Sequence, residues 1–197
     1  GSFRYDGSSR FGSGNRWTPF GRLSAVWQIS KEPFWNLSVL DNLTLRASRG
    51  TAGSAPSFSA QYEVFNVSAT GISTGQAGNA KLRPETTTET ELGVTFDLFG
   101  RLGVELTYAA GTTKDQILPV GTQAAKGFSS QWQNAGTLSN KTWELSLTLP
   151  VLNSKNFYWQ MRGTWDRNRT YVDELFVPEF LYTGGTGQGT GSFFLIT

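Results

Sequence analysis

The residues from Leu82 to Val120 read LRPETTTETELGVTFDLFGRLGVELTYAAGTTKDQILPV and contain two alternating segments joined by a very short turn. Apolar and polar residues alternate over residues 91–97 and again over residues 102–110. Because successive side chains of a strand point to opposite faces, each segment is predicted to be a strand with one apolar and one polar face. Phe99-Gly100-Arg101 is predicted to close the hairpin, with Gly100 supplying the unusual backbone angle.

The same alternation recurs along the chain, so the hairpin is its repeating unit. Gly/Ser-rich segments without sustained periodicity separate the alternating ones and are predicted to be loops, including Thr51–Lys81, the residues after the hairpin to about Ala135, and everything from Asn168 onward with its glycine-heavy YTGGTGQGTGS. The further predicted strands are Phe3–Tyr5 (the end of one), Phe20–Ser30, Leu43–Gly50, Gly136–Pro150 and Phe157–Arg167.

Four regularities point to the wall of a transmembrane β-barrel: the lengths of the connections, the lengths of the strands, the absence of charge at apolar positions and the location of the aromatic residues. The connections alternate between longer and shorter ones, and the predicted strands approach the ~9–11 residues that cross a bilayer. The apolar positions carry no charge in the middle of each strand; Arg49, Lys141 and Arg167 break this rule only near the long loops. Aromatic residues collect near the short turns, where rings favour the headgroup layer: Trp27, Phe34, Trp35, Phe96, Phe99, Phe157 and Trp159. Alternation alone also fits a soluble β-sandwich, which stays open as an alternative.

Composition excludes several classes of function. The net charge of +2, without a Lys/Arg cluster, gives no reason to expect a nucleic-acid partner. The chain has no Cys and no His, which removes thiolate chemistry and the commonest general base and transition-metal ligand. No apolar run approaches the ~18 residues of a membrane helix. We therefore expect no enzyme activity, metal site or cofactor. The chain begins and stops within a strand pattern, which suggests an excerpt of a longer protein.

Five strings follow one another along the chain: YDGSSRFG (Tyr5–Gly12), NRWTPFGRLSAVWQIS (Asn15–Ser30), LTLRASRGTAG (Leu43–Gly53), LRPETTTETELGVTFD (Leu82–Asp97) and QNAGTLSNKTWELSL (Gln133–Leu147). In this order they resemble the barrel region of SusC/RagA-type TonB-dependent outer-membrane transporters, over about Tyr5 to Arg167. Arg49 departs from that pattern, because the family usually carries an aromatic residue in its ASYG-like string.

The resemblance implies an all-β fold, an antiparallel up-and-down meander that forms part of a large transmembrane barrel in the outer membrane of a Gram-negative, Bacteroidota-like cell. Such barrels have about 22 strands around an N-terminal plug. Residues 1–197 would supply about seven of those strands, as an open curved sheet when alone, without the plug or the terminal strand. The implied partners are outer-membrane lipid, a SusD-like surface lipoprotein, TonB through a preceding region, and a glycan or peptide substrate.

Two sets of residues are candidates for function within that wall. Glu89 and Glu91 share a strand face, but with no cleft implied they are expected to line the lumen and not to catalyse. Aromatic side chains in the long loops are candidates for stacking on ligand: Tyr62, Phe65, Phe128 and Trp132. Polar residues expected to face the lumen, where opposite charges can pair across strands or with the plug, are Arg22, Arg46, Glu91, Glu105, Glu144, Arg162 and Asp166.

Two alternatives remain beside active import with a lipoprotein partner. One is a siderophore- or cobalamin-type TonB-dependent receptor that works without a lipoprotein lid. The other is a soluble extracellular β-sandwich that binds carbohydrate.

Overall fold

A computed structural model describes residues 1–11, 14, 16–123 and 127–178 of the chain. The predicted glycine-heavy loop YTGGTGQGTGS lies outside these residues. Strands dominate the described part, with two short 3₁₀ turns, η2 (Ile29–Lys31) and η3 (Phe58–Gln61). The strands are β1 (Ser2–Gly7), β2 (Trp17–Gln28), β3 (Leu40–Ser54), β4 (Val64–Ser68), β5 (Gly71–Ala77), β6 (Glu85–Leu98), β7 (Leu102–Gly121), β8 (Ser130–Ser154) and β9 (Phe157–Leu175).

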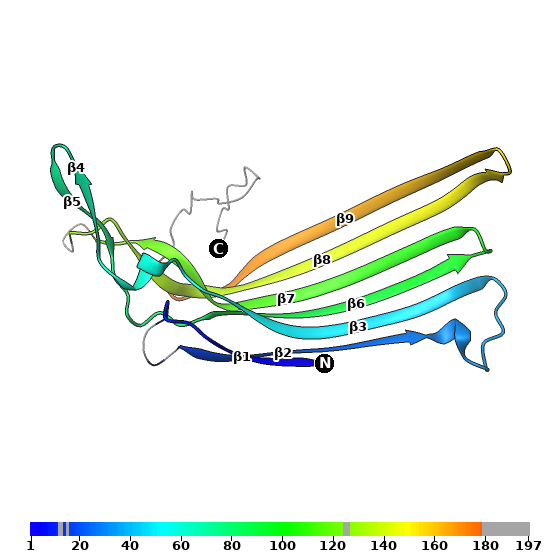
Figure 1. Cartoon of the computed structure of the whole chain (residues 1–197), viewed down its shortest axis with the longest axis horizontal. Coiled ribbons are helices and arrows are strands. Elements are labelled where there is room, and N and C mark those ends of the chain that lie inside the picture. Colours follow the sequence, from blue (N-terminus) through cyan, green and yellow to red (C-terminus); the bar gives the residue numbers. More distant parts are fainter. Residues whose placement is uncertain (12–13, 15, 124–126, 179–197) are drawn as a thin grey trace.

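All nine strands belong to one curved, open sheet (Figure 1). Seven of them form an antiparallel wall in the order β1-β2-β3-β6-β7-β8-β9, in which sequence neighbours pair except where β4 and β5 intervene. The predicted all-β fold and open curved sheet are confirmed. A second, facing sheet is absent from the described residues, so the layers of a sandwich are not formed there. Among these residues, no helix is long and apolar enough to cross a membrane.

The predicted loop Thr51–Lys81 is wrong over its second half, because β4 and β5 form a hairpin there. This hairpin joins the wall through a short parallel contact, in which Gln76 pairs with Ser130 of β8. Ser129 reinforces the contact, since its backbone N–H donates to the carbonyl of Gly75 at 3.1 Å. The meander is therefore interrupted by a projecting hairpin at one end of the wall (Figure 1).

Several strands run further than the alternation predicts, including β3, which continues past Gly50 to Ser54 in the predicted loop Thr51–Lys81. β8 includes residues 130–135, which were predicted as loop, and β9 continues past Asn168 to Leu175. The two strands stay paired as far as Gly136 and Leu175, across a register shift between Thr137 and Leu138. β7 extends to Gly121 through a bulge at Asp115, which has a positive φ of 57°. Backbone pairing sustains these extensions although the sequence no longer alternates there.

The central hairpin turns as predicted, with one addition. The carbonyl of Leu98 accepts a hydrogen bond from the backbone N–H of Arg101 at 3.0 Å. Phe99 and Gly100 both have positive φ angles, 53° and 62°, which is the backbone that type I′ hairpin turns need. The sequence predicts this conformation for Gly100; Phe99 adopts it although bulky residues rarely do.

The connections separate to the two ends of the wall (Figure 1). One end, the turn end, carries the connections 29–39, 99–101 and 155–156. The other, the loop end, carries 8–16, the long segment 55–84 with the β4–β5 hairpin, and 122–129. The predicted sorting by length is wrong in two cases, since 8–16 and 122–129 are both shorter than 29–39. The reason is that the flanking strands, β1 and β2 in one case and β7 and β8 in the other, take up residues that were predicted as loop.

Few side chains are buried in the described part of the chain. The buried side chains that form a hydrophobic cluster lie at the loop end. Phe11, Ala60, Leu82 and Ile117 form a cluster, and the partly buried Trp132 packs against it. These residues come from four separate parts of the chain. We call them the loop-end cluster. The wall itself has one layer and exposes its apolar side chains.

Candidate functional site: two faces of the wall and its loop end

The strand register places all seven predicted lumen residues on one face of the sheet, the polar face. Arg22 lies opposite Gly50, Glu91 opposite Ser48, and Arg46 opposite Gly93. The same rows continue across β7, β8 and β9, because residues paired in a sheet point to the same side. They reach the remaining members of the set, which are Glu105 opposite Ser146, Glu144 opposite Asp166, and Arg162 opposite Thr148.

Arg46 makes the clearest polar contact of this face. Its Nη2 lies 2.7 Å from Glu105 Oε1, and its Nη1 donates to Thr95 Oγ1 at 2.9 Å. The side chain thus crosses β6 from β3 to reach β7. Gly93 leaves room for it, because a Cβ at Gly93 would meet the Arg46 guanidinium at 3.1 Å. Opposite charges do pair across strands here, and the role of Gly93 was not anticipated from the sequence.

A shallow polar depression lies on the same face over β7, β8 and β9. Glu105, Glu144, Arg162 and Asp166 contribute to its lining. Glu144 and Asp166 are direct partners in the register, and like charges placed so are unfavourable without a cation or water between them. This arrangement favours a hydrated surface.

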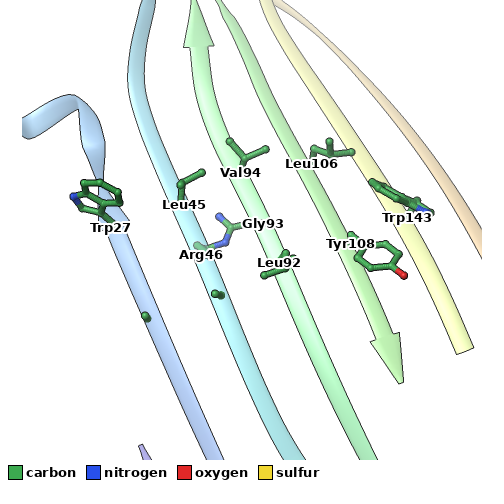
Figure 2. A pocket seen from close by; sticks show the side chains of 11 residues that line it. Trp27, Leu45, Arg46, Leu92, Gly93, Val94, Leu106, Tyr108 and Trp143 are labelled. Atoms are coloured by element: carbon green, nitrogen blue, oxygen red, sulfur yellow. The ribbon is translucent and has the colours of Figure 1, made fainter. Parts of the chain in front are cut away.

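The opposite face, the apolar face, carries aligned rows of apolar side chains from β2, β3, β6, β7 and β8 (Figure 2). They leave a shallow apolar groove along the sheet. Trp27 is 50% exposed, Leu92 51% and Trp165 52%, so in this sheet the apolar face is uncovered. The apolar side chains of these rows that Figure 2 labels are Trp27, Leu45, Leu92, Val94, Leu106, Tyr108 and Trp143.

Aromatic residues border the apolar face at the turn end of the wall. Phe99 is exposed in the hairpin turn, and Phe157 and Trp159 are exposed at the start of β9. Two Trp side chains are tied to their connection: Trp27 Nε1 donates to Glu32 Oε1 at 2.9 Å, and Trp35 Nε1 donates to the carbonyl of Leu40 at 3.2 Å. The aromatic residues therefore lie where the sequence pattern predicts a belt.

The four candidate loop aromatics separate into three places at the loop end. Phe65 and Phe128 meet edge to face, 5.9 Å between ring centroids, where the β4–β5 hairpin approaches the 122–129 connection. Tyr62 lies against Phe58 at 5.7 Å and is exposed. Trp132 packs on the loop-end cluster, and its Nε1 donates to Gln76 Oε1 at 2.7 Å.

Sequence reasoning missed a polar network at the entry to β6. Arg83 pairs with Asp115 at the β7 bulge, and its backbone exchanges hydrogen bonds with the side chain of Asn134 on β8. Glu85 accepts hydrogen bonds from the Ile117 backbone N–H at 3.1 Å and from Gln116 Nε2 at 2.9 Å. Burial raises the pKa of the Glu85 carboxyl, although the hydrogen bond from Ile117 opposes that shift. The string LRPE, in which a proline precedes the strand, was the available signal.

The described residues hold no group of three or more acidic side chains arranged to bind a metal ion. What the geometry offers is two contrasting faces and an elaborated loop end. A one-layer sheet with an uncovered apolar face needs another apolar phase against it, because leaving so much apolar surface in water is unfavourable.

The chain matches the family model described as "TonB dependent receptor-like, beta-barrel" over residues 1–192. It is 32% identical over 189 residues to TonB-dependent receptor P26 of Formosa agariphila, a match that covers 90% of this chain and 19% of that protein. It is 31% identical over 185 residues to TonB-dependent receptor SusC of Bacteroides thetaiotaomicron, covering 85% of this chain and 18% of SusC.

A solved structure of the RagAB peptide importer in a closed–closed state superposes on the chain with a TM-score of 0.78 and 28% identity, covering 93% of this chain and 21% of that one. The chain thus spans about a fifth of the length of the relatives it matches. The SusC/RagA resemblance of the five strings is confirmed. The soluble-sandwich alternative does not hold, because the matched family forms barrels. The chain belongs to the family of TonB-dependent receptor-like β-barrels.

Proposed function

We propose that this chain is part of the barrel wall of a SusC-like outer-membrane transporter that imports glycans or peptides with a SusD-like lipoprotein. The observation that carries the proposal is the register-aligned division of the sheet into an apolar and a polar face, in a chain of this family. Similarity to the RagAB peptide importer and to SusC supports the class of cargo and the lipoprotein partner. Energy would come from TonB through a preceding region of the full-length protein.

Each surface then has its own task. The apolar face would contact lipid, as the exposed Leu92 and Trp165 suggest. The polar face would line the lumen and contact the plug or cargo, with the Arg46–Glu105 pair keeping two charges partnered in place. The mechanism is transport by displacement of the plug. It requires no catalytic residue from this wall.

The loop end would contribute the contacts to cargo or to the lipoprotein. The Phe65–Phe128 pair and Tyr62 offer ring faces on which sugars or peptides stack. Trp132 would instead anchor the β4–β5 hairpin, because it packs against the loop-end cluster and donates a hydrogen bond to Gln76 of β5.

The test uses the full-length protein in its native host, tagged and followed through membrane fractionation. We expect it in the outer membrane, extracted only by detergent and accompanied by a surface lipoprotein. Recovery in a soluble fraction would overturn the proposal. Recovery in the outer membrane without a lipoprotein, together with uptake of a siderophore or cobalamin and not of glycans or peptides, would favour the other cargo class.

A second test addresses the loop aromatics. The double variant Phe65→Ala/Phe128→Ala should reduce cargo uptake or lipoprotein retention, measured in cells with equal outer-membrane levels of the protein. Val67→Ala is the matched control, because Val67 lies on the same hairpin and is exposed without an aromatic ring. Equal losses in both would mean that the hairpin matters only for folding.

A further inference from the structure

On the described strands, the basic residues of the apolar face lie at its loop-end boundary or beyond it. One register row runs from Leu23 on β2 and Arg49 on β3 through Thr90 and Ala110 to Lys141 on β8 and Arg169 on β9. Arg167 belongs to the next row toward the turn end, opposite Trp143. We call Lys141, Arg167 and Arg169 the basic cluster.

The three cations of the basic cluster are close together by register. Lys141 and Arg169 are direct partners across β8 and β9, so their Cβ atoms lie roughly 4.5–5.5 Å apart. Arg167 and Arg169 are two residues apart on one strand and point to the same side. Like charges placed directly opposite one another destabilise a sheet. The cluster therefore favours an anion between its members.

Within the described part of the chain, no carboxylate neutralises this cluster. The ion pairs found there join Arg4 with Asp6, Arg46 with Glu105, and Arg83 with Asp115. Asp173, further along β9, accepts a hydrogen bond from Ser139 Oγ at 2.8 Å. Glu144 and Asp166 are adjacent to the cluster in sequence but have the opposite parity, which places them on the polar face.

The depth of the cluster matches the boundary of a membrane. Toward the turn end, the same face continues with Leu145, Trp165 and Leu147. A cation on the lipid face costs roughly 2–4 kcal/mol at the bilayer midplane and about 0–1 kcal/mol near the interface. The flanking Trp143 and Tyr171 are both partly exposed, and such rings favour the headgroup layer. Arg and Lys at this level reach the headgroups and not the acyl chains.

We propose that the basic cluster binds phosphorylated headgroups of the lipids in the loop-side leaflet. This inference rests on the proposed function, since it needs the apolar face to contact lipid. Two guanidinium groups supply planar forks that match phosphate oxygens, and the Lys141 ammonium adds a third donor group. The cargo path is on the other face, so the bound anion is lipid and not transported substrate. Arg49 extends the same boundary three strands away.

The experiment measures lipid retention by the full-length protein, purified in detergent and titrated with dioleoyl phosphatidic acid or phosphatidylcholine under native mass spectrometry. We expect saturable binding of phosphatidic acid and weaker binding of phosphatidylcholine. Each cation near an anionic surface contributes about fivefold in affinity, so Lys141→Gln/Arg167→Gln/Arg169→Gln should weaken binding on the order of 100-fold. Arg162→Gln is the control, because Arg162 is on β9 but on the polar face.

Three outcomes would overturn the inference while leaving the proposed function intact. They are equal retention of both lipids by the folded protein, equal loss in the triple variant and in Arg162→Gln, and displacement of the lipid by millimolar inorganic phosphate, which would identify a free anion as the ligand. If the triple variant does not fold, the single variant Arg169→Gln and a salt titration of the unaltered protein replace it. Retention that does not fall with added salt would likewise contradict the inference. Failure of the proposed function is distinct, because the protein would then be absent from the outer membrane.

Discussion

Large apolar side chains are exposed in the wall and buried at the loop end. In the wall, Leu92 and Trp165 are about half exposed, and no second layer covers them in the described residues. At the loop end, Leu82 is completely buried in a cluster assembled from distant segments. The loop end carries a core of its own, as a structure in water must, whereas under the proposed function lipid would cover the apolar face of the wall. Substitutions in the two regions should therefore differ in cost.

The largest effect is expected from Leu82→Ala. Removing a fully buried leucine side chain leaves a cavity, and such changes cost about 2–5 kcal/mol. The matched change in the wall, Leu92→Ala, should cost less than about 1 kcal/mol, because lipid chains can fill the space left beside the sheet. Urea titration of the full-length protein in vesicles, with limited proteolysis at the loop end as the readout, measures both. Equal costs would erase the distinction between the two regions.

A charge introduced into the wall should also reveal which face meets lipid. Leu145→Arg places a cation in the middle of the apolar face and should destabilise the folded barrel by about 2–4 kcal/mol. The neighbouring change Ser146→Arg should be tolerated, because Ser146 is on the polar face opposite Glu105. The urea midpoint, followed by heat-dependent gel migration, compares the two. A greater cost for Ser146→Arg would invert the assignment of the faces.

The Arg46–Glu105 pair should contribute less. Its side chains are 34% and 49% exposed, and partly solvated ion pairs are worth below about 1 kcal/mol. A double-mutant cycle of Arg46→Gln and Glu105→Gln measures their coupling. Gly93→Ala should weaken that coupling by displacing the guanidinium. Coupling that persists unchanged in Gly93→Ala would show that Arg46 does not need the space above Gly93.

The smallest effect is expected from the titration of Glu85, which belongs to the loop end. Burial raises its pKa, so the folded protein holds the proton more tightly than the unfolded chain. The resulting stabilisation is complete below the unfolded pKa of about 4.3 and is lost as pH rises through the higher folded pKa. Glu85→Gln should remove this component of the pH dependence, which proteolysis of the loop end at several pH values would detect. An identical pH profile in both proteins would contradict it.

Much of the wall was predictable because local rules govern it. Alternation around Leu92 and Leu106 predicts both strands and both faces, and the register follows from the short turn at Gly100. The set of residues on the polar face, including Glu144 and Asp166, follows from parity alone. Arg49, Lys141 and Arg167 were also visible as breaks in that parity, whereas Arg169 lay beyond the predicted end of its strand.

The loop end was not predictable in the same way. The β4–β5 hairpin has no sustained alternation, and it is attached to the wall by its pairing with β8 and by the bond from Ser129, just before β8, to Gly75. Trp132 was expected at a ligand surface, but only the positions of Ala60, Leu82 and Ile117 explain why it packs inward. Long-range contacts of this kind leave no periodic signal.

The sequence by itself determined the all-β class, the two faces of the wall and the placement of aromatic residues at the turn end, because each depends on the two-residue period of a strand and on short turns. Only the tertiary structure decided how the loop end assembles. It brought Arg46 over Gly93 to Glu105, placed Glu85 on the β7 bulge, and aligned Lys141 with Arg169 across two strands. The physical reason is that these contacts depend on which strands are neighbours and in what register, and strand order is set by the whole sheet.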